Sequence, residues 1–137
     1  MKLSHARESY YSNSGTASAV ARQAAFAGIA VIWIFNTPTK HVTIAIPSQL
    51  QLVALFLVIC LALDLLQYVF ASIVWGAFSR ILERKYPHRL SEDPEMDASP
   101  FLNWPCLVCF WGKLLALVAA YACLATFIIT KLAAAGP

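Results

Sequence analysis

The residues best suited to chemistry lie inside an apolar stretch, LALDLLQYVF, at positions 61–70. A carboxylate such as Asp64 costs a few kcal/mol at the centre of a membrane helix, and it is tolerated when it is protonated, paired or in a water-filled cavity. Helical spacing places four further residues on the same face: Cys60, Gln67, Tyr68 and Ala71. This face predicts either the lining of an ion path or a hydrogen-bonded contact that holds helices together in an assembly. A catalytic carboxylate is the least favoured reading.

Lys113 is the other charge inside a predicted membrane crossing. Counted from the inner ends of the two helices, Lys113 lies about 12 Å deep and Asp64 about 22 Å deep. A lysine side chain also points toward the N-terminus of its helix, which here is the inner end. We therefore expect Lys113 to reach the inner headgroups. An intramembrane salt bridge with Asp64 is the less favoured alternative.

Positive charges gather in the N-terminal segment and around residues 80–89. Lys and Arg number seven there, against two in the first loop and C-terminus, which predicts a cytosolic N-terminus and an external C-terminus. Most of these charges are expected to form a cytosolic basic ring, which would contact anionic lipid or bind an anionic ligand or nucleic acid. The ring comprises Arg7, Arg22, Arg80, Arg84, Lys85 and Arg89.

Small residues recur at helical spacing in the first apolar segment: Ala21, Ala24, Ala25 and Gly28. Such residues let helix backbones approach closely, so this face is predicted to pack against another helix.

Cys106 and Cys109 form a lone C-x-x-C pair. Zinc needs about four ligands and no second pair completes the set, so we expect ordinary packing cysteines and no metal or cofactor. No phosphate-binding loop, nucleophile elbow or metalloprotease motif is present, which argues against an enzyme.

The segments that carry these residues are predicted to be membrane helices. The chain has 137 residues, of which 60% are hydrophobic and 12% charged, and its mean hydropathy is +0.66. A soluble domain usually has about 25% charged residues. We predict an all-α membrane protein with three transmembrane helices. No cleavable signal peptide is expected, because the N-terminus has no apolar core segment.

The predicted boundaries follow proline and polar residues. A polar segment (1–14) leads into the first crossing (15–36), with a helix start at Ser14 to Thr16. An external loop (37–49), in which VTIAI could be β-like or interfacial, precedes the second crossing (50–79). This helix is about 43 Å long, so we expect it to protrude beyond the ~30 Å hydrocarbon core. A cytosolic stalk and loop (80–104), the third crossing (105–130) and a tail (131–137) complete the chain.

Three stretches carry a resemblance to known proteins: SGTASAVARQAAFAGIAVIWIFN, LALDLLQYVFASIVWGAF and PCLVCFWGK. They resemble small bacterial membrane proteins found beside signalling enzymes in antiphage operons, such as the channel component of the Hailong antiphage system. The resemblance implies a symmetric oligomeric ion channel. It would be held shut by short single-stranded DNA from a partner nucleotidyltransferase and opened when phage activity removes that DNA. The resemblance carries over no ligand-contact residue.

Together these features predict a homo-oligomer, a tetramer or pentamer, in the bacterial inner membrane. Its second helix would line a pore, and opening would depolarise the membrane. If Asp64 lines the path, its charge should favour cations. The alternative is a non-conducting anchor or accessory subunit in which Asp64 docks another protein.

Overall fold

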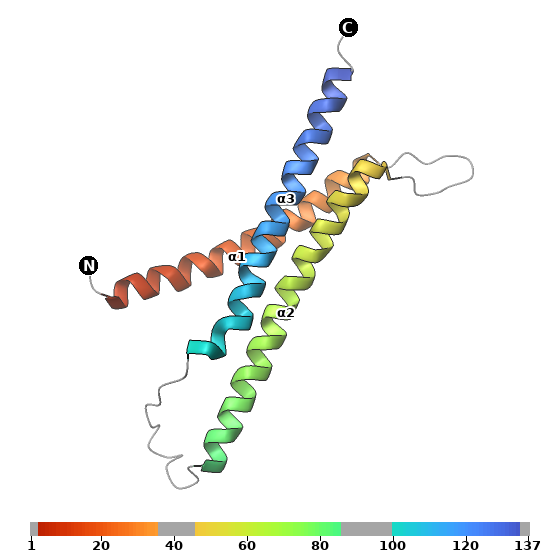
Figure 1. Cartoon of the computed structure of the whole chain (residues 1–137). Coiled ribbons are helices and arrows are strands. Elements are labelled where there is room, and N and C mark those ends of the chain that lie inside the picture. Colours follow the sequence, from red (N-terminus) through yellow and green to blue (C-terminus); the bar gives the residue numbers. More distant parts are fainter. Residues whose placement is uncertain (1–2, 36–45, 86–99, 135–137) are drawn as a thin grey trace.

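A computed structural model describes residues 3–35, 46–85 and 100–134. These contain three long helices, α1 (Leu3–Ile34), α2 (Ser48–Lys85) and α3 (Trp104–Ala134), and a short 3-10 helix, η1 (Pro100–Asn103), before α3 (Figure 1). The described part of the chain has no strand. Most of the VTIAI segment and residues 86–99 of the predicted cytosolic stalk and loop lie outside the described residues. The predicted all-helical fold is confirmed.

Three stretches are long and apolar enough to cross a membrane: one within α1, one within α2, and one that runs from η1 through α3. These stretches are Ser12–Ile34, Ser48–Ile81 and Phe101–Ala134, with mean hydropathies of 1.5, 2.5 and 2.0. A stretch of about 20 apolar residues suffices to cross the hydrocarbon core. The three stretches therefore indicate a membrane location.

The ends of the helices differ from the predicted ones for local reasons. Helix α1 begins at Leu3 and not near Ser14, and the Thr16 hydroxyl donates to the Ser12 carbonyl (3.0 Å) within the helix. Helix α2 begins after Pro47, whose carbonyl accepts from the amides of Leu50 (2.8 Å) and Gln51 (3.2 Å). Pro47 thus occupies the capping position, because its carbonyl closes the first turn. Helix α3 ends at Ala134, one turn beyond the predicted end.

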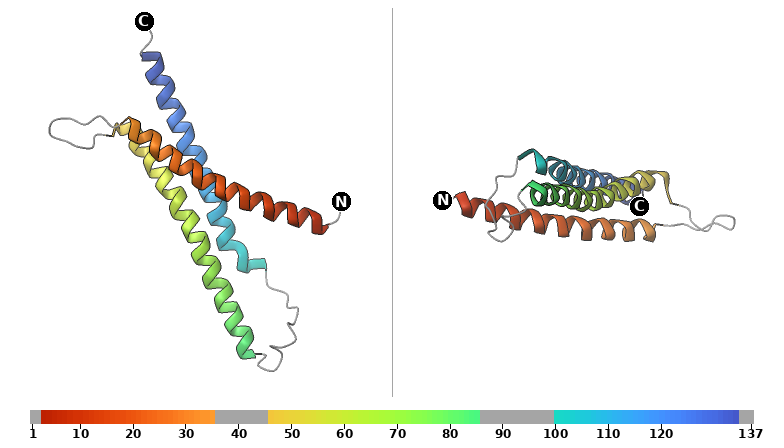
Figure 2. Two further views of the ribbon diagram at one scale, coloured as in Figure 1. Left: turned by 180° about the vertical axis from the view of Figure 1, so that it is seen from behind. Right: turned by 90° about the horizontal axis from the view of Figure 1, so that it is seen from below.

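The helices form two layers. Helices α2 and α3 run antiparallel side by side, and α1 crosses both of them at a steep angle on one side (Figures 1 and 2). The core between them is built from residues three or four positions apart, which share one face of each helix. Its members are Ala25 and Ile32 on α1; Leu50, Val53, Leu57 and Cys60 on α2; and Ala116, Ala120, Leu124 and Phe127 on α3.

Helix α1 approaches α2 closely through small residues. Ala21, Ala25 and Gly28 are buried, and a Cβ atom added at Gly28 would lie 2.9 Å from Leu57 Cδ1. Ala24 is half-buried, and its carbonyl accepts from the Tyr121 hydroxyl of α3 (3.0 Å). The small-residue face predicted from the sequence therefore lies where α1 meets the other two helices.

We expect Gly28→Val to destabilise the protein by about 1–3 kcal/mol, because the added methyl groups would collide with the fully buried Leu57. Gly76→Val is the matched control, since a Cβ at Gly76 meets nothing within 4 Å. The stability of both variants is measured by thermal unfolding in detergent. Equal stability of the two variants would contradict the close approach of α1 to α2.

Candidate functional site: a buried ionic network

A lysine side chain is enclosed between the three helices. Lys113 of α3 is 0% exposed, and its ammonium group donates to three oxygens. These are Ser18 Oγ (2.5 Å) on α1, and Asp64 Oδ1 (2.6 Å) and Gln67 Oε1 (2.7 Å) on α2. An ammonium has three donors and no acceptor, so every donor of this lysine is used.

The carboxylate of Asp64 lies between two cations. Its Oδ1 accepts from Lys113 Nζ and from Ser18 Oγ (3.0 Å), and its Oδ2 lies 3.0 Å from Arg22 Nε. The Arg22 Nε–H is not aligned with the carboxylate as a hydrogen bond requires, so this contact is an ion pair only. Asp64 is 7% exposed, so its negative charge is shielded from the outside of the helix trio by its own partners.

Arg22 and Tyr68 form the outer edge of the network. Arg22 Nη2 donates to the Tyr68 hydroxyl (3.0 Å), and the guanidinium carbon lies 5.8 Å from the centroid of the Tyr68 ring. The Arg22 side chain is 42% exposed and Tyr68 is 51% exposed. This edge therefore opens to the surroundings of the three helices, whereas the Lys113 end is closed.

The network continues the packing face of each helix. Ser18 precedes the buried Ala21 and Ala25 on α1, and Asp64 follows the buried Cys60 on α2 at the same spacing. Lys113 falls between Cys109 and Ala116 on the buried face of α3. Because residues three or four apart share a helix face, the contacts that bury the apolar core also bring these polar groups together.

The expectation that Lys113 reaches the headgroups is wrong. It assumed that the inner ends of the second and third helices are level. Cys106 Sγ, however, lies 3.7 Å from the Gln67 carbonyl, so the first turn of α3 is level with the turn that follows Gln67. Helix α2 continues well past this point to Lys85 (Figure 1). The first turn of α3 thus lies about two turns, or about 10 Å, deeper than Phe78, which is near the predicted inner end of the second crossing. This difference equals the predicted difference in depth between Lys113 and Asp64, so the two residues are level.

The direction predicted for this side chain is nevertheless right. Lys113 Nζ lies 5.4 Å from the centroid of the Phe110 ring, one turn nearer the N-terminus of α3. The side chain thus points back along its helix, as helical geometry requires. It meets Gln67 and Asp64 there, before it could reach any headgroup.

The structure separates the residues that the sequence grouped as pore-lining. Cys60 and Asp64 are buried inside the chain's own helix trio, Gln67 and Ala71 are half-buried, and Tyr68 is exposed. Within one chain Asp64 therefore faces α1 and α3, and the alternative of a helix contact describes it better than a pore wall. That contact lies inside one chain and not between copies.

The predicted basic ring is also divided. Arg22 lies beside Asp64 and Tyr68, whereas the exposed Arg80 is three turns further along α2, or about 18 Å. Arg84 is exposed one turn beyond Arg80. The side chains of Arg7 and Lys85, and all of Arg89, lie outside the described residues. Arg22 thus belongs to the buried network and is not a neighbour of Arg80 within one chain.

The sequence offered a weak signal for the residues that were missed. Ser18 and Arg22 are four positions apart and flank Ala21 on the small-residue face of α1. Polar residues on such a face have to meet the helix that packs there, which here carries Asp64. A lone serine among alanines is common in membrane helices, so residue type alone does not single out Ser18.

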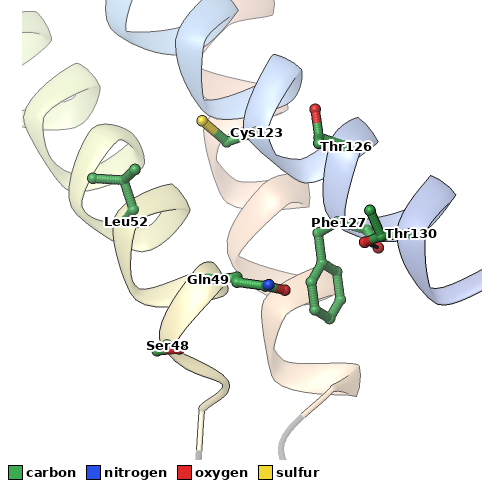
Figure 3. Close-up of a pocket in the computed structure, with 7 residues that line it drawn as sticks. All are labelled: Ser48, Gln49, Leu52, Cys123, Thr126, Phe127 and Thr130. Atoms are coloured by element: carbon green, nitrogen blue, oxygen red, sulfur yellow. Dashed lines mark hydrogen bonds between the residues drawn. The ribbon is translucent and has the colours of Figure 1, made fainter.

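Elsewhere the described residues offer little that could bind a metal or a polar ligand. They contain no group of three His, Cys, Asp or Glu side chains placed for a metal, and Cys60, Cys106, Cys109 and Cys123 are free thiols. A hollow of about 430 Å³ lies between the start of α2 and the end of α3 (Figure 3). The hydroxyls of Thr126 and Thr130 in its wall donate to carbonyls of their own helix (2.8 Å each).

No protein-family model, curated protein or solved structure matches this chain. The resemblance to antiphage membrane effectors therefore stays a prediction.

We expect Lys113→Met to destabilise the protein by about 3–5 kcal/mol, because it leaves a buried carboxylate without its main partner. Lys131→Met, at the exposed end of the same helix, is the matched control and should change stability by less than about 0.5 kcal/mol. The stability of both variants is measured by unfolding in a denaturing detergent. Asp64→Asn should reduce stability less in the Lys113→Met variant than in the wild type, since the two groups interact directly. Equal losses in the two lysine variants would contradict the network.

Proposed function

We propose that the protein is a homo-oligomeric ion channel of a bacterial inner membrane. The observation that carries this proposal is the half-exposed guanidinium of Arg22 in the middle of the span Ser12–Ile34. Arg22 lies about 15 Å or more from either end of that span along the helix, so the proposal places its guanidinium within the apolar layer of the membrane. A charge exposed at this depth is costly in lipid, whereas a water-filled path removes the cost.

The path would lie between copies of the chain. The three helices close around Lys113 and Asp64, so a water-filled route requires further copies that face the Arg22 edge. We favour a tetramer or pentamer, with the apolar outer faces of the helices turned to lipid or to neighbouring copies. The N-terminus would be cytosolic, and α2 beyond α3 would project into the cytosol.

The gate would respond to an anionic ligand. Arg80 and Arg84 are exposed, one turn apart, on the part of α2 that extends past α3. Repeated in an oligomer, they would create a positive surface suited to a short oligonucleotide, bound in a salt-dependent manner. Such a ligand, made by a partner nucleotidyltransferase, would make the channel an effector of antiphage defence that depolarises the membrane on opening.

A non-conducting anchor or accessory subunit is the second candidate. Its support is that Lys113 uses all its donors within one chain, so the network can serve solely to hold the three helices together. The exposed Arg22 edge would then be covered by a different protein.

The two candidates differ in mass and in conductance. We expect the purified protein to elute as one homo-oligomer by size exclusion with light scattering, and to pass ionic current in planar lipid bilayers. Short single-stranded DNA should change that current in the wild type. It should have no effect on a variant with Arg80→Gln and Arg84→Gln, which keeps the buried network and serves as the matched control.

A monomer that carries no current with or without DNA would contradict the channel and favour the anchor. Current that is insensitive to DNA in the wild type would contradict the ligand gate alone.

A further inference from the structure

The buried network carries more positive than negative charge. Lys113 and Arg22 both contact Asp64, so two cations share one carboxylate. Among the side chains that the structure describes, the other acidic residue is Glu83, which lies about 28 Å away along α2. Within the described side chains, one positive charge at the middle of the three spans is therefore without a counter-charge.

The excess charge lies at the open edge of the network. Lys113 is closed off by its three acceptors, whereas the Arg22 side chain is 42% exposed. A guanidinium has five N–H donors, and Arg22 directs Nε toward Asp64 and one Nη2 donor to the Tyr68 hydroxyl. No other hydrogen bond of this guanidinium is present among the described residues, so its remaining donors are available to a ligand at the exposed edge. Because the Tyr68 hydroxyl accepts from Arg22, its own proton is available to a further acceptor.

We infer that Arg22 and Tyr68 form a binding site for a small inorganic anion such as chloride. The guanidinium and phenol present hydrogen-bond donors together with net positive charge, and an anion satisfies both. In the proposed channel, a lipid phosphate at the headgroups is about 15 Å or more from Arg22 along the helix, whereas a small ion can enter a water-filled path. Among the described side chains, the acidic group that a second copy would bring to this depth is its own Asp64, which is buried and bound to its own Lys113.

This inference rests on the proposed channel for the route by which the anion arrives. It also changes the expected selectivity. The sequence alone favours cations, because it predicts Asp64 as the charge in the path, but Asp64 is 7% exposed and Arg22 is the accessible charge. Charged side chains that line a path attract ions of opposite sign, so the channel selects anions.

The binding site is tested first without reference to conductance. Thermal unfolding of the purified wild type is measured in chloride and in gluconate, a larger anion, at equal ionic strength. Chloride should raise the unfolding temperature in a saturable manner, and Lys131→Gln, a control at an exposed cation outside both proposed binding surfaces, should behave like the wild type. Tyr68→Phe keeps the ion pair with Asp64 and removes one donor, so it should weaken the apparent chloride affinity about tenfold.

Arg22→Gln should abolish the chloride effect, and if it does not fold, Tyr68→Phe decides the question. A wild type that shows no difference between chloride and gluconate would overturn the inference. So would a chloride effect that is unchanged in Tyr68→Phe.

Selectivity is tested next, from the reversal potential in planar bilayers under a KCl gradient. The wild type should reverse near the chloride equilibrium potential. A current that reverses near the potassium potential would overturn anion selectivity and leave the proposed channel intact. Saturable chloride binding without any current would support the site and contradict the channel.

Discussion

The structure depends on one enclosed ammonium group. Lys113 is fully buried, and its three donors are satisfied by one oxygen on α1 and two on α2. In a membrane this requirement is strict, because there is no water to replace a missing partner. A shift of any helix by one turn would leave the ammonium or the Asp64 carboxylate unpaired. The network therefore fixes the register of three helices whose outer faces are mostly apolar.

Apolar burial alone could not fix that register. Lipid tails are as apolar as leucine, so helices gain little from burying one apolar face in place of another. Close packing and hydrogen bonds provide the specificity instead, and here the two are coupled. Gly28, Ala25 and Ala21 let α1 approach α2, and this approach brings Ser18 and Arg22 within reach of Asp64. The small residues and the charges thus act together along a single face of α1.

The same arrangement explains why the helices could be predicted from the sequence and the network could not. The three apolar runs are separated by proline and polar segments, so the all-helical fold with three candidate spans follows from composition. Pairing between helices does not, because it depends on where α3 begins beside α2. Equal depth for the two inner helix ends was a natural assumption, and α2 invalidates it by continuing past the start of α3 (Figure 1).

Arg22 shows a second limit of reading charges along one chain. Its place near the polar N-terminal segment grouped it with Arg80 and Arg84, whereas its actual partners are on a helix 46 residues further along the chain. Counting positive charges near helix ends predicts orientation, but it does not reveal an acidic partner on another helix.

The contact between Lys113 and Asp64 is tested most directly by solid-state NMR of the protein in lipid bilayers. The experiment measures dipolar coupling between isotope-labelled Asp carboxyl carbons and Lys side-chain nitrogens. The 2.6 Å separation of Lys113 Nζ and Asp64 Oδ1 requires strong coupling between these two groups, absent in Lys113→Met. Coupling that is missing in the wild type, or unchanged in Lys113→Met, would contradict the buried network.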